Sequence, residues 1–508
     1  MSLSPQHNLY QYFAVQIEKF ADKLAVIAEQ QTGLTFRQLD QQSGKLANAL
    51  SERGLKPGDR VTAQIEKSPM ALCLYLACLR AGGVFHPLNT GYQPGELAFF
   101  VDNAQPSIII TDPSNMALFQ SLPGAPKPDR ILTLDAHGQG SLVDLAQSQS
   151  AKATITHRNA ADPAALLYSS GTTGTPKGIK LSHGNLVSNA SVLTEHWQFS
   201  DRDVLLHALP IYHVHGLFVA VGCALMSGAG MRWLKVFDAS EVVEALPHCS
   251  VMMGVPTYYT RLLASDAFTR DVAGHCRLFI SGSAPLLPET FRDFENRTGK
   301  RIVERYGLTE TMINTSSPLE GERRVGKVGL PLESIDVRVV DEQGQPLGPG
   351  ETGQIEVRGP NVFSGYWRAP EKTHQDFTPD GYFRTGDNGM WDEDGYLSIV
   401  GRAKDMVISG GLNIYPREVE MLLDQLPGVE ESAVIGVAHT DFGEALVALL
   451  VAEAGVDINE ACVRAKLKTQ IAGFKVPKRV IQIDQLPRNA MGKVQKNQLR
   501  KQFRELFT

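Results

Sequence analysis

An alternation of short apolar runs with helical patterns over roughly the first 300 residues constrains the fold most strongly. Runs rich in Val, Ile and Leu occupy 60–64, 107–111 and 164–169, and each has the length of a strand. Because strands covered by helices on both faces are continuously apolar, this alternation predicts parallel-sheet α/β layers. A helix is predicted where Thr35 precedes an amphipathic run that ends before Gly54, since threonine caps helix starts and glycine helix ends.

The pattern changes twice in the second half of the chain. From 337 to 400, short strands alternate with Gly-containing turns, which predicts a small antiparallel β unit. After Gly401, Pro416 can open a helix, 432–438 is typical of a strand, and 459–471 is typical of a second helix. Because 508 residues exceed a single core, we expect several subdomains, the last block forming a domain of its own.

The composition argues against several classes of protein. The chain is 43% hydrophobic and 20% charged, near the globular average. Its net charge of −6 argues against nucleic-acid binding, because that binding depends on an excess of clustered Lys and Arg. The apolar stretches are far below the roughly 20 residues of a membrane span, and the N-terminus lacks a signal-peptide pattern. We expect a cytoplasmic protein without nucleic-acid or membrane partners. Its six cysteines form no CxxC pair and are predicted to be buried and reduced: Cys73, Cys78, Cys223, Cys249, Cys276 and Cys462.

A phosphate-binding loop is indicated by YSSGTTGTPKG at 168–178. It follows an apolar, strand-like segment, its glycines permit close backbone approach, its hydroxyls donate hydrogen bonds, and Lys177 supplies positive charge. It is not a Walker A loop, because Lys177 is followed by Gly178, not by Ser or Thr.

This loop resembles the signature of the adenylate-forming acyl-CoA synthetase superfamily, which also contains luciferases and peptide adenylation domains. Five further motifs follow in the family's order: SGSAPL at 281–286, YGLTET at 306–311, YFRTGD at 382–387, GRAKDMVISGG at 401–411 and PRNAMGKVQK at 487–496. The resemblance spans essentially the whole chain. It implies an α/β fold with a large AMP-binding and acyl-binding domain over 1–403, built of two αβ layered subdomains plus a small β subdomain. The resemblance further implies a small, mobile α+β domain over 404–508 that carries the catalytic lysine.

The resemblance also implies the reaction and its residues. A substrate carboxylate attacks the α-phosphate of ATP with Mg²⁺ present, and CoA then takes up the acyl group. The implied catalytic residues are Lys493, Lys177, Thr309, Glu310 and His213, with Glu310 also contacting the metal. The implied ATP and AMP ligands are Ser169, Ser170, Gly171, Thr172, Thr173, Gly174, Lys177, Ser283, Ala284, Pro285, Tyr306, Gly307, Thr309, Asp387 and Arg402. Lys404 matches the hinge, and Ser409, Gly410 and Gly411 match the CoA segment. Lys493 lies in a Gly-containing loop and is chemically open to a protein acyltransferase.

Arg305 indicates the class of acid, because relatives usually carry glycine at this position of the acyl pocket. A buried, unpaired arginine would disfavour an apolar acyl chain, whereas its guanidinium can hold a second carboxylate bidentately. The alternative is that Arg305 pairs with Glu304 or another acid. His213 and His215 predict a polar wall beside it; a metal pair is the alternative, although no Cys or carboxylate cluster accompanies them. Arg323 and Arg324, on a polar stretch, are alternative carboxylate ligands.

With these residues the chain most closely resembles malonyl-CoA synthetases. The implied reaction converts malonate, ATP and CoA to malonyl-CoA, AMP and diphosphate through a malonyl-adenylate. Methylmalonate, oxalate and succinate stay as alternatives, because one methylene in a pocket discriminates by only about 1–3 kcal/mol. A CoA ligase for aryl or fatty acids, and a standalone adenylation domain that loads a carrier protein, are further alternatives.

Overall fold

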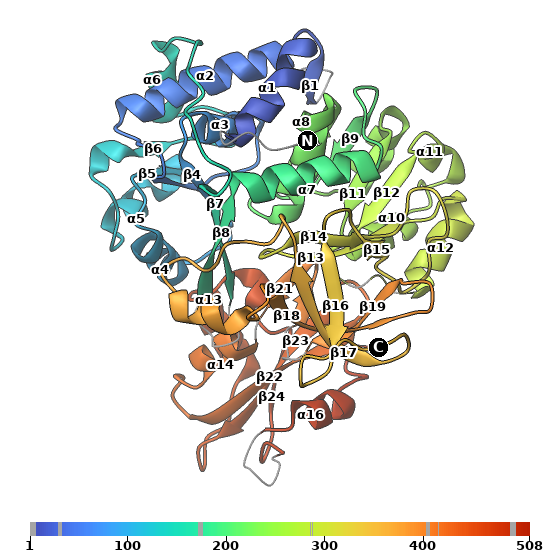
Figure 1. Ribbon diagram of the computed structural model, residues 1–508. Coiled ribbons are helices and arrows are strands. Elements are labelled where there is room, and N and C mark those ends of the chain that lie inside the picture. The colour runs from blue at the N-terminus through green and yellow to red at the C-terminus, as the bar shows by residue number, and fades with distance from the viewer. Residues whose placement is uncertain are drawn as a thin grey trace.

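Two αβ layers make up most of the large domain in the computed structural model (Figure 1). The structure describes residues 7–28, 33–170, 176–284, 286, 288–402, 407–414, 416–487 and 494–507. The first layer contains a six-stranded sheet of order β6-β5-β3-β4-β7-β8. Its strands are β3 (Arg60–Gln64), β4 (Val84–Pro87), β5 (Ile108–Thr111), β6 (Ile131–Thr133), β7 (Pro163–Ser170) and β8 (Pro176–Ser182). All neighbours are parallel except β7 and β8, which form a hairpin.

The second layer contains a nine-stranded sheet of order β15-β14-β13-β12-β11-β9-β10-β1-β2. Its strands are β1 (Leu24–Ile27), β2 (Gly33–Thr35), β9 (Val204–His207), β10 (Gly230–Trp233), β11 (Val251–Gly254), β12 (Leu278–Ser281), β13 (Val303–Leu308), β14 (Met312–Ser316) and β15 (Leu330–Pro331). The interior strands from β13 to β1 are parallel, which confirms the predicted α/β class. The strands β2, β14 and β15 run antiparallel to their neighbours. Between β13 and β14, the connection 309–311 is too short for a parallel crossover.

The helices of the large domain flank the two sheets. They are α1 (Leu9–Lys19), α2 (Phe36–Glu52), α3 (Pro69–Arg80), α4 (Pro94–Ala104), α5 (Met116–Ser121), α6 (Ser141–Gln147), α7 (His183–His196), α8 (Val221–Ser227), α9 (Ala239–Ala245), α10 (Pro256–Leu263), α11 (Arg270–Gly274), α12 (Pro288–Thr298) and α13 (Pro370–Asp376). Short helical turns are η2 (Pro113–Asn115), η3 (Pro128–Arg130), the π-helical η4 (His215–Ala220) and η5 (Leu246–His248). The helix predicted after Thr35 is confirmed as α2, whose first turn Thr35 and Gln38 close with a capping box.

A four-stranded antiparallel sheet forms the β subdomain, as predicted for 337–400. Its strands are β16 (Asp336–Val340), β17 (Thr352–Arg358), β18 (Phe383–Trp391) and β19 (Leu397–Arg402). One apolar core runs from the two αβ layers into this sheet, where it includes Ile355 and Val357. The β subdomain is therefore packed as part of the large domain.

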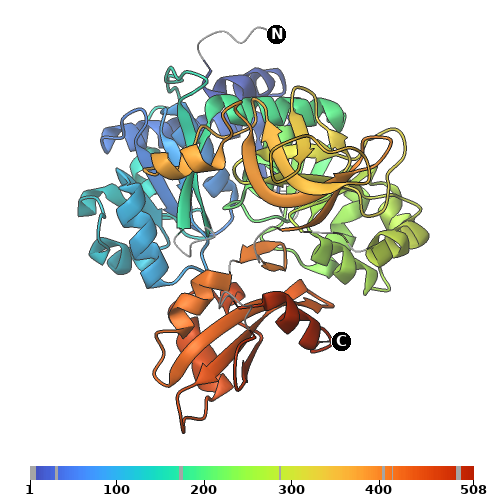
Figure 2. The same ribbon diagram turned by 60° about the horizontal axis from the view of Figure 1, so that its bottom comes forward.

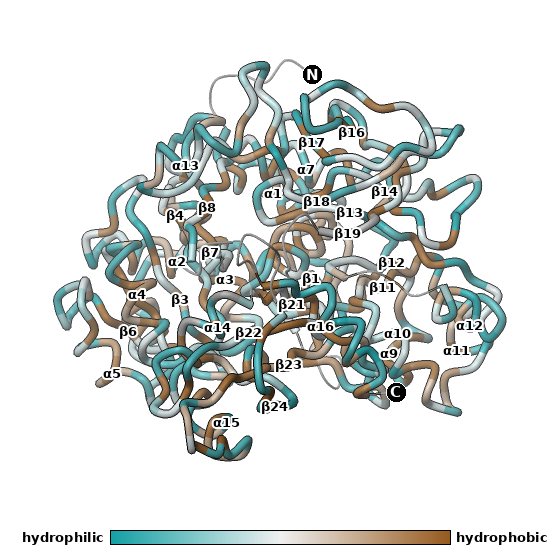
Figure 3. Tube along the Cα trace, turned by 90° about the horizontal axis from the view of Figure 1, so that it is seen from below, coloured by the Kyte–Doolittle hydropathy of each residue, from teal (hydrophilic) through white to brown (hydrophobic). Residues whose placement is uncertain are grey.

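The C-terminal segment folds around its own sheet, of order β21-β20-β23-β22 with β24 beside β23. Its elements are β20 (Val407–Ser409), β21 (Leu412–Ile414), α14 (Pro416–Leu423), β22 (Val429–His439), β23 (Gly443–Ala452), α15 (Glu460–Lys468), η6 (Gly473–Lys475), β24 (Arg479–Gln482) and α16 (Lys496–Gln502). The helix predicted at Pro416, the strand at 432–438 and the helix within 459–471 are confirmed. The two main apolar clusters of this segment contain only its own residues. Figures 2 and 3 show it lying across the boundary between the two αβ layers.

Two further sequence predictions can be compared with the described residues. Five cysteines are buried and unbridged, but Cys462 is exposed, because it lies on the outer face of α15. The prediction that all six are buried is therefore wrong for Cys462. Within the described ranges, no helix is both long and apolar enough to cross a membrane.

Candidate functional site

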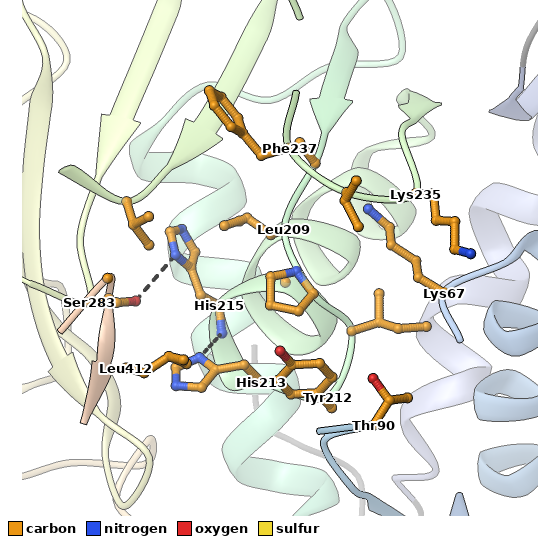
Figure 4. A pocket seen from close by; sticks show the side chains of 18 of the residues that line it. Lys67, Thr90, Leu209, Tyr212, His213, His215, Lys235, Phe237, Ser283 and Leu412 are labelled. Carbon is orange, nitrogen blue, oxygen red and sulfur yellow. Dashed lines mark hydrogen bonds between the residues drawn. The ribbon is translucent and has the colours of Figure 1, made fainter. Parts of the chain in front are cut away.

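A cavity of about 490 Å³ opens beyond the carboxyl ends of β12 and β13. Parallel strands end at one edge of their sheet, where α/β proteins commonly bind ligands. Its lining includes Arg305, Tyr306 and Asp387, and the C-terminal segment contributes Ile408 and Glu444. A second cavity of about 290 Å³, part of which Figure 4 shows, shares His213, His215 and Ser283 with the first.

Arg305 is a buried cation without a carboxylate partner among the described residues. It is 6% exposed, its Nη2 donates to Ser283 Oγ at 3.4 Å, and its Nε has no hydrogen-bond partner in the described part of the chain. Burial lowers its pKa to about 9. Glu304 does not pair with it: burial raises the Glu304 pKa to about 8, with only the backbone of Gly326 opposing that rise. The alternative of a Glu304 ion pair is therefore wrong, and Arg305 is available to an anion.

Two small residues hold the Arg305 guanidinium in place. A Cβ at position 282 would lie 2.3 Å from Arg305 Cζ, so Gly282 leaves the space that the guanidinium fills. Ser283 adopts a φ of 70°, uncommon for a residue with a side chain. Its Oγ lies 3.4 Å from Arg305 Nη2 and 3.3 Å from His215 Nδ1. Sequence reasoning missed Gly282, although the motif SGSAPL contained it.

His213 and His215, which we call the histidine wall, line both cavities, and Figure 4 shows them at the 290 Å³ cavity. His213 Nδ1 accepts from His215 N at 3.4 Å, and His215 opens the π-helical turn η4, a kind of turn frequent at functional sites. Burial and the charge of Arg305 lower the His213 pKa to about 4 and hold the His215 pKa well below its ordinary value. Both rings are therefore neutral at pH 7. Among the described residues, no group of three or more His, Cys, Asp or Glu side chains could hold a metal ion.

Tyr306 and Asp387 also line the large cavity, and their side chains meet there. The Tyr306 hydroxyl donates to Asp387 Oδ2 at 2.6 Å, and both side chains are buried. The β18–β19 ladder places Asp387 opposite Arg402 in the main chain. Gly307 is needed where β13 turns into β14, because a Cβ there would lie 1.8 Å from Met312 O. Two motifs distant in sequence thus share this cavity, and Ser283 and Ala284 line it too.

The two ends of the predicted phosphate loop belong to a hairpin. Ser169 in β7 pairs with Lys177 in β8, so Lys177 lies in a strand, contrary to the prediction of a loop position. Ser169 Oγ donates to Glu310 Oε1 at 3.4 Å. A small cavity of about 90 Å³ is lined by Ser169, His213 and Thr309, among others. The loop ends and the YGLTET motif therefore face one another.

Several predicted site residues lie outside the described residues. These are Gly171, Thr172, Thr173, Gly174, Pro285, Lys404 and Lys493. The side chains of Ser170 and Arg402 also lie outside what the structure describes.

The β20–β21 hairpin of the C-terminal segment reaches the histidine wall. Gly410 and Gly411 line the 290 Å³ cavity with His213 and His215, and Ser409 is buried just before them. Both glycines have a positive φ, and a Cβ on Gly411 would lie 2.8 Å from Val255 Cγ1. Gly411 therefore allows this hairpin to approach the large domain closely.

Lys67 lines the same cavity and was missed by the sequence reasoning (Figure 4). Its ammonium donates to His207 Nδ1 and His207 O at 2.8 and 2.7 Å, and burial holds its pKa well below its ordinary value. The available signal was a charged residue between the strand at 60–64 and the helix at Pro69.

Arg323 and Arg324 have other partners. Arg323 donates to the carbonyl oxygens of Pro318, Arg301 and Leu319, which braces its own loop. Arg324 forms ion pairs with three carboxylates, those of Glu322, Asp392 and Asp394. The alternative that these arginines hold the substrate carboxylate is therefore wrong.

Comparison with known proteins yields family matches over most of the chain. The AMP-binding enzyme model matches residues 13–367, and the AMP-binding enzyme C-terminal domain model matches 418–493. A sulfoacetate–CoA ligase of Cupriavidus necator is 34% identical, over 96% of each chain. A malonate–CoA ligase of Arabidopsis thaliana is 35% identical, over 83% of this chain and 74% of its own. The crystal structure of ATP-bound MatB from Rhodopseudomonas palustris is 49% identical, covers 98% of this chain and all of its own, and superposes with a TM-score of 0.77.

Proposed function

The chain belongs to the AMP-binding enzyme family and is an AMP-forming acyl-CoA synthetase, and on that premise we propose that its acid is malonate. The proposed reaction converts malonate, ATP and CoA to malonyl-CoA, AMP and diphosphate through malonyl-adenylate. The observation that carries the proposal is Arg305, a buried arginine at the cavity with no carboxylate partner among the described residues.

A dicarboxylate satisfies this site better than a monocarboxylate. An unpaired buried guanidinium costs several kcal/mol, of the order found for breaking buried ion pairs, and a second carboxylate would offset that cost through a bidentate contact. Ser283 contacts the guanidinium, the neutral His215 contacts Ser283, and both side chains can donate further hydrogen bonds. Two relatives point the same way, because malonate and sulfoacetate each carry a second anionic group beside the reacting carboxylate.

The first half-reaction joins malonate to the α-phosphate of ATP. One malonate carboxylate would be held by Arg305 while the other attacks the α-phosphorus; a P–O bond forms and diphosphate leaves with the electron pair of the broken bond. We assign the triphosphate to the hairpin ends at Ser169 and Lys177 with the intervening loop, and the base and ribose to Tyr306 and Asp387. His213 and Lys493 would stabilise the reacting carboxylate.

A magnesium ion fits this arrangement through Glu310. Glu310 lies beside Ser169 at the phosphate end of the site, and Mg²⁺ is commonly held by one or two carboxylates together with substrate phosphates. When bound there, Mg²⁺ would neutralise phosphate charge, with Glu310 and Thr309 as the adjoining protein groups.

The second half-reaction transfers the malonyl group to CoA. The thiol attacks the carbonyl carbon of malonyl-adenylate, loses its proton, and AMP leaves. We assign the approach of CoA to Ser409, Gly410 and Gly411; the two glycines lie at the histidine wall, and Ser409 is buried just before them. The boundary between the domains is proposed at 403/404, with Lys404 as the hinge about which the C-terminal domain turns between the two half-reactions.

Gly411→Ala should lower the rate of thioester formation about tenfold and leave adenylate formation within twofold of wild type. The added Cβ would lie 2.8 Å from Val255 Cγ1 and push the β20–β21 hairpin away from the cavity. Hydroxylamine trapping of malonyl-adenylate without CoA measures the first step, and malonyl-CoA formation from preformed adenylate measures the second. Gly410→Ala is the matched control, since its φ is also positive but its Cβ would have no neighbour nearer than 3.5 Å. Equal losses in the two variants would contradict the steric explanation.

The proposed function is tested by CoA-dependent AMP formation over a panel of acids. The panel contains malonate, methylmalonate, oxalate, succinate, sulfoacetate, acetate, coumarate and octanoate at equal concentrations. We expect malonate to show the highest kcat/KM, with acetate, coumarate and octanoate at least about 10²-fold lower, because they leave the buried arginine unpaired. A preference for a monocarboxylate would overturn the assignment of the substrate. Formation of malonyl-adenylate without AMP release when CoA is added would favour a carrier-protein acceptor.

A further inference from the structure

A buried ion triad joins the C-terminal domain to the six-stranded layer. Lys475 Nζ, in η6, lies 2.8 Å from Glu96 Oε1 and 2.7 Å from Glu418 Oε1. Glu96 belongs to α4 of the large domain, whereas Glu418 and Lys475 belong to the C-terminal domain. The three side chains are only 8%, 11% and 5% exposed, in the order Glu96, Glu418, Lys475. We call these three residues the Glu96–Lys475–Glu418 triad.

The charges of the triad are largely shielded from water. The lysine pKa is held above its ordinary value: burial acts to lower it, but Glu418, Tyr92 and Glu96 together outweigh burial. The ammonium also lies 5.2 Å from the Tyr92 ring centroid, and this ring belongs to the large domain. Lys475 is therefore charged, and it contacts both domains at once.

A second ion pair across the same interface differs in being exposed. Arg261 of α10 donates to both Asp441 carboxylate oxygens at 3.1 Å, and the two side chains are 44% and 40% exposed. Exposed pairs contribute little, whereas removing one partner of a buried pair leaves an uncompensated charge. Of these two contacts, the triad therefore has the larger effect on how the domains sit.

The pose with the intact triad brings the β20–β21 hairpin to the cavities of about 490 and 290 Å³. The C-terminal residues that line the three cavities include Ile408, Gly410, Gly411 and Lys475. No described residue of 494–507 lines any of the three, and Val494 packs instead with Leu486 and Leu499. This is the arrangement that the proposed function assigns to thioester formation.

We propose that Glu96 and Lys475 are positioning residues that select the thioester-forming pose by making a buried ion pair in that pose alone. This inference rests on the proposed function, which has the C-terminal domain turn between two half-reactions. When the domain turns away, Lys475 keeps Glu418 of its own domain, while Glu96 keeps only its helix-capping bond from Gln93 N. An interaction made in one pose and not in the other shifts the equilibrium between them.

Glu96→Gln tests the interdomain bond with little disturbance elsewhere. The amide retains an oxygen that can cap α4, and Lys475 retains Glu418, so each domain keeps its internal contacts. We expect thioester formation from preformed malonyl-adenylate to fall about tenfold, within the range of coupling between contacting residues. Adenylate formation, measured by hydroxylamine trapping, should not fall. Equal losses in the two half-reactions, or no loss in either, would overturn the proposal.

Two further variants separate the triad from general effects at the interface. Arg261→Gln removes the exposed pair and should change both half-reactions less than about twofold; a tenfold loss of thioester formation there would overturn the special role of the triad. The exchange Glu96→Lys with Lys475→Glu keeps one lysine and two glutamates at the interface. It should recover thioester formation above the level of Lys475→Glu alone, and a folded double variant without recovery would contradict the ion-pair explanation.

The experiment also distinguishes this inference from the proposed function. If wild-type enzyme formed no adenylate from malonate, the substrate assignment would fail, and the half-reactions would be repeated with the preferred acid of the panel. If wild type activates malonate and Glu96→Gln leaves thioester formation unchanged, only the role of the triad fails.

Discussion

Arg305→Leu is expected to lower kcat/KM for malonate about 10³-fold. The variant removes a buried guanidinium that no described carboxylate neutralises, so the second carboxylate of malonate would enter the buried pocket without a counter-charge. Activation of short monocarboxylates such as propionate should rise, because their apolar ends no longer desolvate an arginine. The measurement is CoA-dependent AMP formation with malonate and with propionate, for wild type and variant side by side.

Arg305→Lys is the matched variant for this prediction. It keeps a positive charge but loses the planar fork that grips a carboxylate through two parallel hydrogen bonds. We expect it to retain a preference for malonate over propionate at a lower kcat/KM than wild type. Unchanged malonate kinetics in Arg305→Leu would contradict the dicarboxylate site, and folding of each variant is checked by its thermal unfolding midpoint.

Lys493→Ala is expected to lower the rate of malonyl-adenylate formation at least about 10²-fold, the effect typical of removing one preorganised stabilising group. The lysine would bring a point charge to the reacting carboxylate and the α-phosphate in the adenylating pose, a role that a flexible ammonium suits. Pyrophosphate exchange and hydroxylamine trapping both measure this step.

Thioester formation provides the internal control for Lys493→Ala. Supplied malonyl-adenylate should be converted to malonyl-CoA within threefold of the wild-type rate, because the assigned role ends when the adenylate forms. Normal pyrophosphate exchange in the variant would refute the assignment of Lys493. Equal losses in both half-reactions would indicate a structural role for this loop.

Local patterns were sufficient for most secondary structure and for much of the chemistry of the site. The strand at 60–64, the capped helix after Thr35 and the helix at Pro416 follow from residues only a few positions apart. The antiparallel edge strands did not follow, because their partners depend on the length of a connection and on which sheet edge stays open. The strand position of Lys177 was missed for the same reason: its partner Ser169 lies across a hairpin.

The sequence by itself determined which residue types belong to the site, because YGLTET, YFRTGD and the arginine at 305 are local patterns with definite chemistry. Only the tertiary structure decided how they act together. It showed that Arg305 does not pair with its neighbour Glu304, that Gly282 makes room for the guanidinium, and that Lys475 bonds Glu96 from 379 positions away. The physical reason is that a charge's partners, burial and pKa depend on the three-dimensional surroundings, which sequence neighbours describe only in part.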